Sequence, residues 1–126
     1  MITAAIALAA AATGSLPDPQ NDPDVHCVAA VTFALGVMMK SEDADPKALI
    51  GLTAITWYYI GKIDALRPNF DYKTSLVKLF DSPAFGEHLQ ANLQRCGEEA
   101  EQRGKAIEQL GEDLQKAAPL SPMKPG

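Results

Sequence analysis

Apolar residues recur along most of the chain at steps of three and four, the spacing that places them on one side of a helix. Nowhere do apolar and polar residues alternate for long enough to indicate a strand. The pattern predicts an all-α fold, a small helical bundle of three long helices and one short helix. The expected helix bounds follow from local start and stop signals. Asp-Pro, Ser-Pro and Asp71 mark helix starts, and Pro68 marks the end of a helix. The bounds are 23 to about 40, 46 to 66 or 67, 72–80, and 83 to about 118.

The first and last long helices have different apolar patterns. In the first, apolar residues cover most of the circumference, which predicts deep burial: Cys27, Val28, Val31, Phe33, Ala34, Leu35, Val37, Met38 and Met39. In the last, one stripe is interrupted only where Arg103 takes a seam position: Phe85, Leu89, Leu93, Cys96, Ala100, Ile107, Leu110, Leu114 and Ala117. So regular a stripe predicts one long, continuous C-terminal helix with one apolar face.

Glycines repeat every seven residues along one edge of this stripe, at Gly97, Gly104 and Gly111. Each costs about 1 kcal/mol relative to alanine inside a helix, so a packing reason is expected. The second long helix offers a matching small-residue stripe that includes Gly51 and Gly61. We predict a close antiparallel contact between the last helix and either the second helix or the first. The alternative is that the glycines loosen a solvent-exposed helix.

The beginning of the chain has the composition of an export signal. Residues 1–14 are small and apolar, and no basic residue precedes Lys40, so either the leader is weak or the true start lies upstream. We expect 1–14 to be a signal peptide, 15–22 a linker, 23–118 a single helical domain and 119–126 a disordered tail. An alanine-rich first helix packed on the domain is the alternative. No membrane span is expected in the mature chain, because spanning takes about 20 apolar residues.

Two cysteines are present, Cys27 in the first long helix and Cys96 in the last. In an exported domain such a pair forms a disulfide by default. The bond would close a loop of about 70 residues and contribute roughly 4 kcal/mol in the chain-entropy account. Free buried thiols, or a reactive or intermolecular role, are the alternatives. The leader and the cysteines together predict a periplasmic or secreted protein.

Charge narrows the range of partners. The net charge is −5, and an acidic surface repels both phosphate backbones and anionic membranes. We therefore expect no nucleic-acid partner. Three acid–base pairs at i,i+4 on the last helix predict a solvated face, with an acidic partner-binding face as the alternative: Glu99 with Arg103, Glu101 with Lys105, and Glu112 with Lys116.

Catalytic chemistry has few candidates. No local motif links the two histidines, His26 and His88, to a nucleophile. Zinc-type spacings such as H-E-x-x-H do not occur in the sequence. We therefore expect no enzyme, no metal site and no cofactor. Haem held by histidine and by Met38 or Met39 is the alternative in an all-α frame, although methionines on apolar helices usually fill core gaps.

The most distinctive local sequence is the aromatic segment 53–64. A concentration of aromatic, lysine and aspartate side chains on an apolar helix is typical of a small-molecule or peptide pocket, and its candidate residues are Trp57, Tyr58, Tyr59, Lys62 and Asp64. The structural alternative places Trp57 and Tyr59 in the core, pairs Asp64 with Arg67, and lays Tyr58 over the stem of Lys62.

The leader, a cysteine heading an apolar helix, the element Tyr58-Tyr59-Ile60-Gly61-Lys62-Ile63-Asp64 and a second cysteine in the last helix together resemble a group of small, uncharacterised exported proteins of alphaproteobacteria. A weaker similarity is to the acid-stress chaperones of the periplasm, which are helical with one disulfide. The resemblance implies compartment and fold more than activity. We expect a non-enzymatic exported protein that binds an unidentified protein or peptide partner, or holds structure. The alternatives are a periplasmic holdase chaperone and a bundle that binds a small ligand or haem.

Overall fold

A computed structural model describes residues 16–118 of the chain. Within that range the fold is all-helical, as the hydrophobic pattern predicts. A short 3-10 helix, η1 (Pro19–Asn21), is followed by four α-helices: α2 (Pro23–Met39), α3 (Pro46–Leu66), α4 (Tyr72–Phe80) and α5 (Pro83–Ala117). These bounds agree with the expected helices to within about a residue. The predicted signal peptide and tail lie outside the described residues.

Aspartates cap three of the four α-helices, which explains why the starts of these helices could be predicted from the sequence. Asp22 accepts a hydrogen bond from the backbone N–H of Asp24, and Asp45 accepts one from Lys47, at 2.9 and 3.0 Å. Asp71 does the same for Thr74 at the start of α4. Each bond satisfies one of the N–H groups that the first turn of a helix leaves free. A proline at the first position of α2 and α3 already has the backbone angle that a helix requires.

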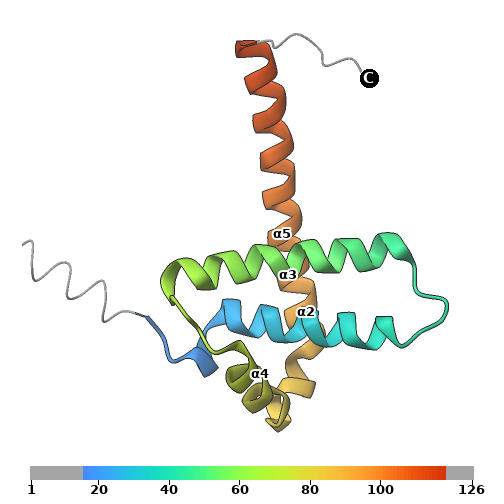
Figure 1. Ribbon diagram of the computed structural model, residues 1–126, viewed down its shortest axis with the longest axis vertical. Coiled ribbons are helices and arrows are strands. Elements are labelled where there is room, and N and C mark those ends of the chain that lie inside the picture. Colours follow the sequence, from blue (N-terminus) through green and yellow to red (C-terminus); the bar gives the residue numbers. More distant parts are fainter. Residues whose placement is uncertain (1–15, 119–126) are drawn as a thin grey trace, which may run out of the picture.

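Helices α2 and α3 run antiparallel beside each other, and α5 crosses both steeply (Figure 1). The short α4 lies near the start of α5, where Phe80 and Phe85 pack at a ring-centroid distance of 5.1 Å. The core lies where α2, α3 and α5 meet. Its buried members come mainly from the first half of α2 and from the facing side of α3: Val25, Cys27, Val28, Ala29, Val31, Tyr59, Ile63, Leu79 and Cys96.

The predicted deep burial of α2 is correct only for its first half. Toward its C-terminal end Phe33 and Val37 are partly exposed, and Met39 is 69% exposed. The reason is the position of the crossing: α5 meets α2 at Cys27 and, through Phe85 in its first turn, at Phe33, so the last turn of α2 extends past α5. The apolar residues on all sides of α2 therefore predicted more burial than the neighbouring helices provide.

The second half of α5 leaves the core and projects as a single helix (Figure 1). Every residue from 101 to 118 is exposed. The three long helices thus pack together only around Cys96. Only about the first half of α5 is part of the bundle. Among residues 16–118, none of the helices is both long and apolar enough to cross a membrane.

The segment predicted as a linker contains η1 and packs on the domain. The Gln20 side-chain amide donates to the carbonyl oxygen of Ser75 at 3.1 Å, and His26 Nε2 lies 2.6 Å from the carbonyl oxygen of Gln20. These bonds fasten the entry to α2 against α4 and give His26 a structural partner.

Candidate protein-interaction site

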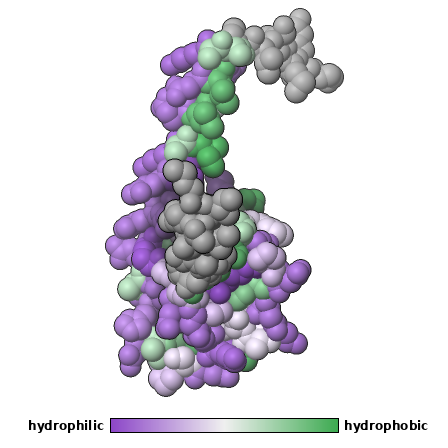
Figure 2. All heavy atoms as spheres, turned by 90° about the vertical axis from the view of Figure 1, so that its left-hand side faces the viewer, coloured by the Kyte–Doolittle hydropathy of each residue, from purple (hydrophilic) through white to green (hydrophobic). Residues whose placement is uncertain are grey.

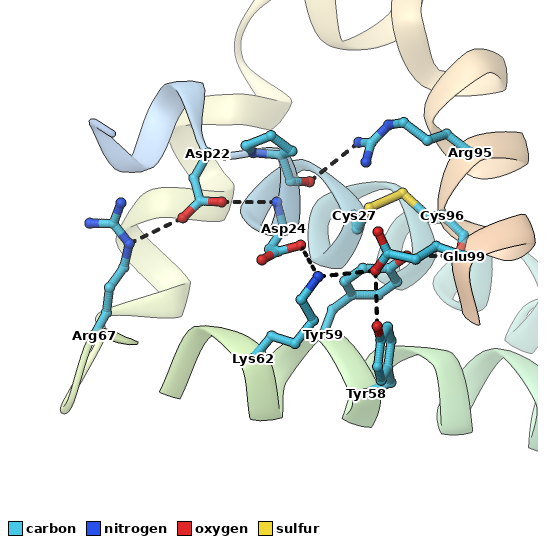
Figure 3. Close-up of polar contacts among 11 residues, drawn as sticks. Asp22, Asp24, Cys27, Tyr58, Tyr59, Lys62, Arg67, Arg95, Cys96 and Glu99 are labelled. Carbon is cyan, nitrogen blue, oxygen red and sulfur yellow. Dashed lines mark hydrogen bonds and ion pairs between the residues drawn. A yellow bond between two sulfur atoms is a disulfide. The ribbon is translucent and has the colours of Figure 1, made fainter. Parts of the chain in front are cut away.

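The five residues predicted to form a pocket do not gather at one place. Tyr59 is fully buried and belongs to the core, whereas Trp57 is 68% exposed. Tyr58 and Lys62 point toward α5 (Figure 3). Asp64 accepts a hydrogen bond from Tyr72 at the start of α4. The aromatic segment therefore contributes to three separate environments rather than to one ligand pocket.

The structural alternative for this segment is partly correct. Tyr59 is a core residue, and the Lys62 ammonium lies 5.5 Å from the centroid of the Tyr58 ring. Trp57 is not in the core. Asp64 does not pair with Arg67, whose Nε instead lies 3.2 Å from a carboxylate oxygen of Asp22.

A polar clamp, defined here as Asp24, Tyr58, Lys62 and Glu99, joins α2, α3 and α5 (Figure 3). The Lys62 ammonium donates to Asp24 at 2.9 Å and to Glu99 at 3.0 Å. The Tyr58 hydroxyl donates to the same Glu99 oxygen at 3.1 Å. The expected pairing of Glu99 with Arg103 is therefore wrong, because α3 supplies a closer cation. The pair of Glu101 with Lys105 is present at 3.2 Å.

Burial and hydrogen bonding act against each other on the clamp's charges. Desolvation raises the pKa of Glu99, but the hydrogen bonds from Lys62 and Tyr58 outweigh it and hold that pKa below its ordinary value. Desolvation lowers the pKa of Lys62, and the bonds to Asp24 and Glu99 outweigh it in turn, so that this pKa is raised. Both shifts favour the charged forms. The clamp is therefore a mutually satisfied ion-pair network between three helices.

One turn of α5, from Arg95 to Glu99, is held to the other helices by a disulfide and by hydrogen bonds. Cys27 and Cys96 form the predicted disulfide, with a Cα–Cα distance of 5.7 Å. One turn on, Glu99 enters the clamp, and one residue before the disulfide Arg95 donates to the carbonyl oxygen of Pro23 at 3.3 Å (Figure 3). The helix leaves the core with its direction set by α2 and α3.

Sequence reasoning missed the partners of the clamp. The sequence pattern assigns no role to Asp24 and predicts that Glu99 lies on a solvated face. The signal that could have found them is the position of Lys62, a lone cation on an otherwise apolar stretch of α3, which needs an acidic partner on a neighbouring helix.

His26 and Met38 do not lie where they could bind one haem together. His26 and Met38 lie at opposite ends of α2, about 18 Å apart along the helix, which is too far for two axial ligands of one haem. His26 and His88 both line a small cavity of about 310 Å³ near the start of α5. No cluster of three metal-binding side chains occurs within the described range.

The projecting half of α5 carries a continuous apolar stripe. Ile107, Leu110 and Leu114, named here the α5 stripe, are 64%, 55% and 58% exposed. Figure 2 shows hydrophobic residues gathered along one side of the projecting helix and hydrophilic residues along the other. Scattered apolar residues are normal on a surface, but an aligned apolar row indicates an interaction site.

The glycines do not mediate the predicted close helix contact. A Cβ built at Gly51, Gly61, Gly97, Gly104 or Gly111 would have no heavy atom within 4 Å among the described residues. The cause is geometric, because α5 crosses α3 steeply instead of lying along it (Figure 1). Gly104 and Gly111 therefore stand on the exposed half of α5, beside the α5 stripe.

Two other surfaces expose apolar side chains. Ile50 and Trp57 lie on α3 beside a shallow hollow of about 390 Å³. A second groove, of about 450 Å³, runs between α2 and α4 and is lined in part by Phe33, Val37 and Phe80. Both are patches on the body of the fold, whereas the α5 stripe stands clear of it.

Comparison with known proteins gives no relative from which a function could be transferred. No protein-family model matches the chain, and neither the curated proteins nor the solved structures gave a match.

Proposed function

We propose that this chain is a non-enzymatic, exported helical protein that binds a partner protein through the α5 stripe. The carrying observation is the exposure of Ile107, Leu110 and Leu114 in one row on a helix that projects from a covalently fastened base. Burying a large aliphatic side chain contributes about 1.5–3 kcal/mol. A partner that covered the whole row would gain several times the thermal energy.

The shape of the stripe favours a helical partner. Its residues follow steps of three and four, which place them along one side of an α-helix. An amphipathic helix laid along such a row can interleave its own apolar side chains with them. A helix that is already formed and held at its base loses little conformational freedom on binding, which favours association.

Export is part of the proposal and is supported by the buried disulfide. Disulfides persist in oxidising compartments and are rare in a reducing cytosol. The Cys27–Cys96 bond joins elements 69 positions apart in the chain, so the fold as described contains an oxidised cysteine pair. On that ground we propose that the protein is periplasmic or secreted.

Site-specific cross-linking tests the proposed binding face. A photoreactive amino acid replaces Leu110 in one version of the full chain and Glu112, on the hydrophilic side of the same helix, in another. Each is expressed in a host that exports it, and adducts are compared after illumination. We expect a discrete protein adduct from position 110 and none from position 112. Equal adducts from both positions, or none from either, would overturn the proposal.

A holdase chaperone is the second candidate function, and the apolar groove between α2 and α4 favours it. Together with Trp57 on α3, this groove gives the body of the fold further apolar surface that unfolded clients could contact. The test is protection of an aggregating client at pH 3 and at pH 7. Protection that appears only in acid supports the chaperone, and absence of protection at both values removes it.

A further inference from the structure

We infer that the α5 stripe binds the same stripe of a second copy of this chain, and that the two helices pair antiparallel. This inference rests on the proposed function, because it names the occupant of the same face. The argument comes from the spacing along the helix, from the distribution of its charges and from the length of helix that is free.

The seam of the projecting half has the pattern of a helix that packs on another helix. From Ala100 to Ala117 its positions alternate steps of three and four without a break, which is the repeat of knobs-into-holes pairing. The members are Ala100, Arg103, Ile107, Leu110, Leu114 and Ala117. A partner with the same repeat is at hand in every other copy of the chain.

The charged seam residue selects the antiparallel arrangement. In a parallel pair Arg103 would face Arg103 of the second copy, and the two cations would repel. In an antiparallel pair Ile107 stands level with Leu110 of the second copy, and Arg103 stands level with Leu114. The long aliphatic stem of arginine can then cover that leucine while its guanidinium reaches water.

The charges near the seam favour the same direction. Arg103 lies in the inner part of the seam, and Asp113 flanks its outer part. Antiparallel pairing brings Arg103 of each helix to within one residue of the level of Asp113 of the other. The two helix dipoles also oppose each other in this arrangement, which is the favourable orientation.

The edge beside the seam leaves room for a close approach. Gly104 and Gly111 flank it on one side, and in the antiparallel register each stands nearly level with the other in the second copy. A Cβ at either position would be in open space within the described part of a single chain. Gly104 and Gly111, which no contact among the described residues of one molecule explains, would lie where two backbones meet.

The free length limits the strength of this pairing. The register overlaps residues 100 to 117, a strip of about 27 Å at 1.5 Å per residue. At the inner end α3 blocks further overlap with the helix of the second copy, because the Tyr58 hydroxyl is already hydrogen-bonded to Glu99 there. Such a strip lies at or below the low end of specific interfaces, about 1,200 Å² in total. We therefore expect a weak, reversible dimer with a dissociation constant on the order of 10 μM.

Sedimentation equilibrium of the full oxidised chain between about 1 μM and 1 mM tests the inference. We expect a monomer–dimer equilibrium for the wild type and monomer throughout for Leu110→Glu, with Ile107→Ser as a second variant in case the first fails to fold. Trp57→Glu is the matched control, since Trp57 is an exposed apolar residue away from the seam, and it should dimerise as the wild type does. A wild type that stays monomeric to 1 mM, or a Leu110→Glu or Ile107→Ser dimer, would overturn the inference.

A charge exchange tests the direction of the helices. Arg103→Glu places a second acid within one residue of the level of Asp113 of the other copy, so the dissociation constant should rise about tenfold. Adding Asp113→Arg should restore it to within about threefold. Failure of that rescue would contradict antiparallel pairing. If the wild type is monomeric while position 110 still yields a cross-linked partner, the second-copy inference is wrong and the proposed function stands.

Discussion

The Tyr59 hydroxyl donates a hydrogen bond of 2.8 Å to the carbonyl oxygen of Cys96, the residue whose sulfur is bonded to Cys27. Three helices therefore meet at one residue, α2 through the disulfide and α3 through the tyrosine. Burial raises the pKa of Tyr59, so its hydroxyl keeps its proton and remains a donor throughout the range in which proteins are stable. This junction fixes the direction in which α5 leaves the core.

Tyr59→Phe should destabilise the fold by about 1 kcal/mol. The change removes a buried hydrogen bond and leaves the shape of the ring in place, and such bonds contribute on the order of 1 kcal/mol. Urea unfolding at pH 7 measures the difference. Tyr58→Phe is the control, because that hydroxyl is only partly buried, and a smaller loss is expected there. An equal loss in both variants would contradict a special role for the junction.

Replacing both cysteines should cost several kcal/mol. The disulfide closes a loop between residues 69 apart, for which the chain-entropy relation gives about 4 kcal/mol. The variant Cys27→Ala with Cys96→Ala should therefore unfold at a much lower urea concentration than the oxidised wild type. Reduced wild type provides the control and should behave similarly. Equal midpoints for oxidised and cysteine-free protein would show that the bond is dispensable.

Acid should weaken the polar clamp through Glu99. Its pKa is lower in the folded chain than in the unfolded one, so its contribution is complete above the unfolded value near 4.5 and is lost as the pH falls through the lowered folded value. The side chain is 41% exposed, so the expected contribution is small, about 0.5 kcal/mol.

The measurement is the stability difference between wild type and Glu99→Gln at pH 6 and at pH 3. The wild type should be the more stable at pH 6, and the difference should shrink toward zero at pH 3. Glu101→Gln, on the exposed part of α5, is the control and should show less dependence. A stability difference that grows as the pH falls would contradict a stabilising role for the ionised Glu99.

Gly104→Ala should make the projecting half of α5 more helical. The added methyl group meets open space within the described chain, and alanine is favoured over glycine by about 1 kcal/mol in a helix interior. Because the segment is not part of the core, the effect should appear as slower amide exchange between 104 and 118 and hardly in global unfolding. If Gly104 instead packed closely against another helix of the same molecule, the substitution would lower the global stability.

The helices were predictable from the sequence because capping residues and prolines next to each helix end determine where it begins and stops. Asp22 and Asp45 each precede a proline and cap a helix, so the starts of α2 and α3 follow from neighbouring residues alone. The pairing of Cys27 with Cys96 followed because no other cysteine is available.

The contacts between helices were less predictable because they depend on crossing angles. The heptad repeat of Gly97, Gly104 and Gly111 is equally consistent with a helix inside the bundle and with one outside it, and only the steep crossing of α5 decides between them. The same angle brings Glu99 to Lys62 instead of Arg103. A local i,i+4 rule could not anticipate a cation supplied by another helix.

Amide hydrogen exchange of the oxidised chain at about 1 μM tests the central claim most directly, that the second half of α5 projects without tertiary cover. Isolated helices of this length are marginal in water, so residues 101–118 should exchange at least about 100-fold faster than the buried turns 25–31 of α2. Protection of 101–118 equal to that of the α2 core would mean that this half of the helix is packed within the fold, and would contradict the account.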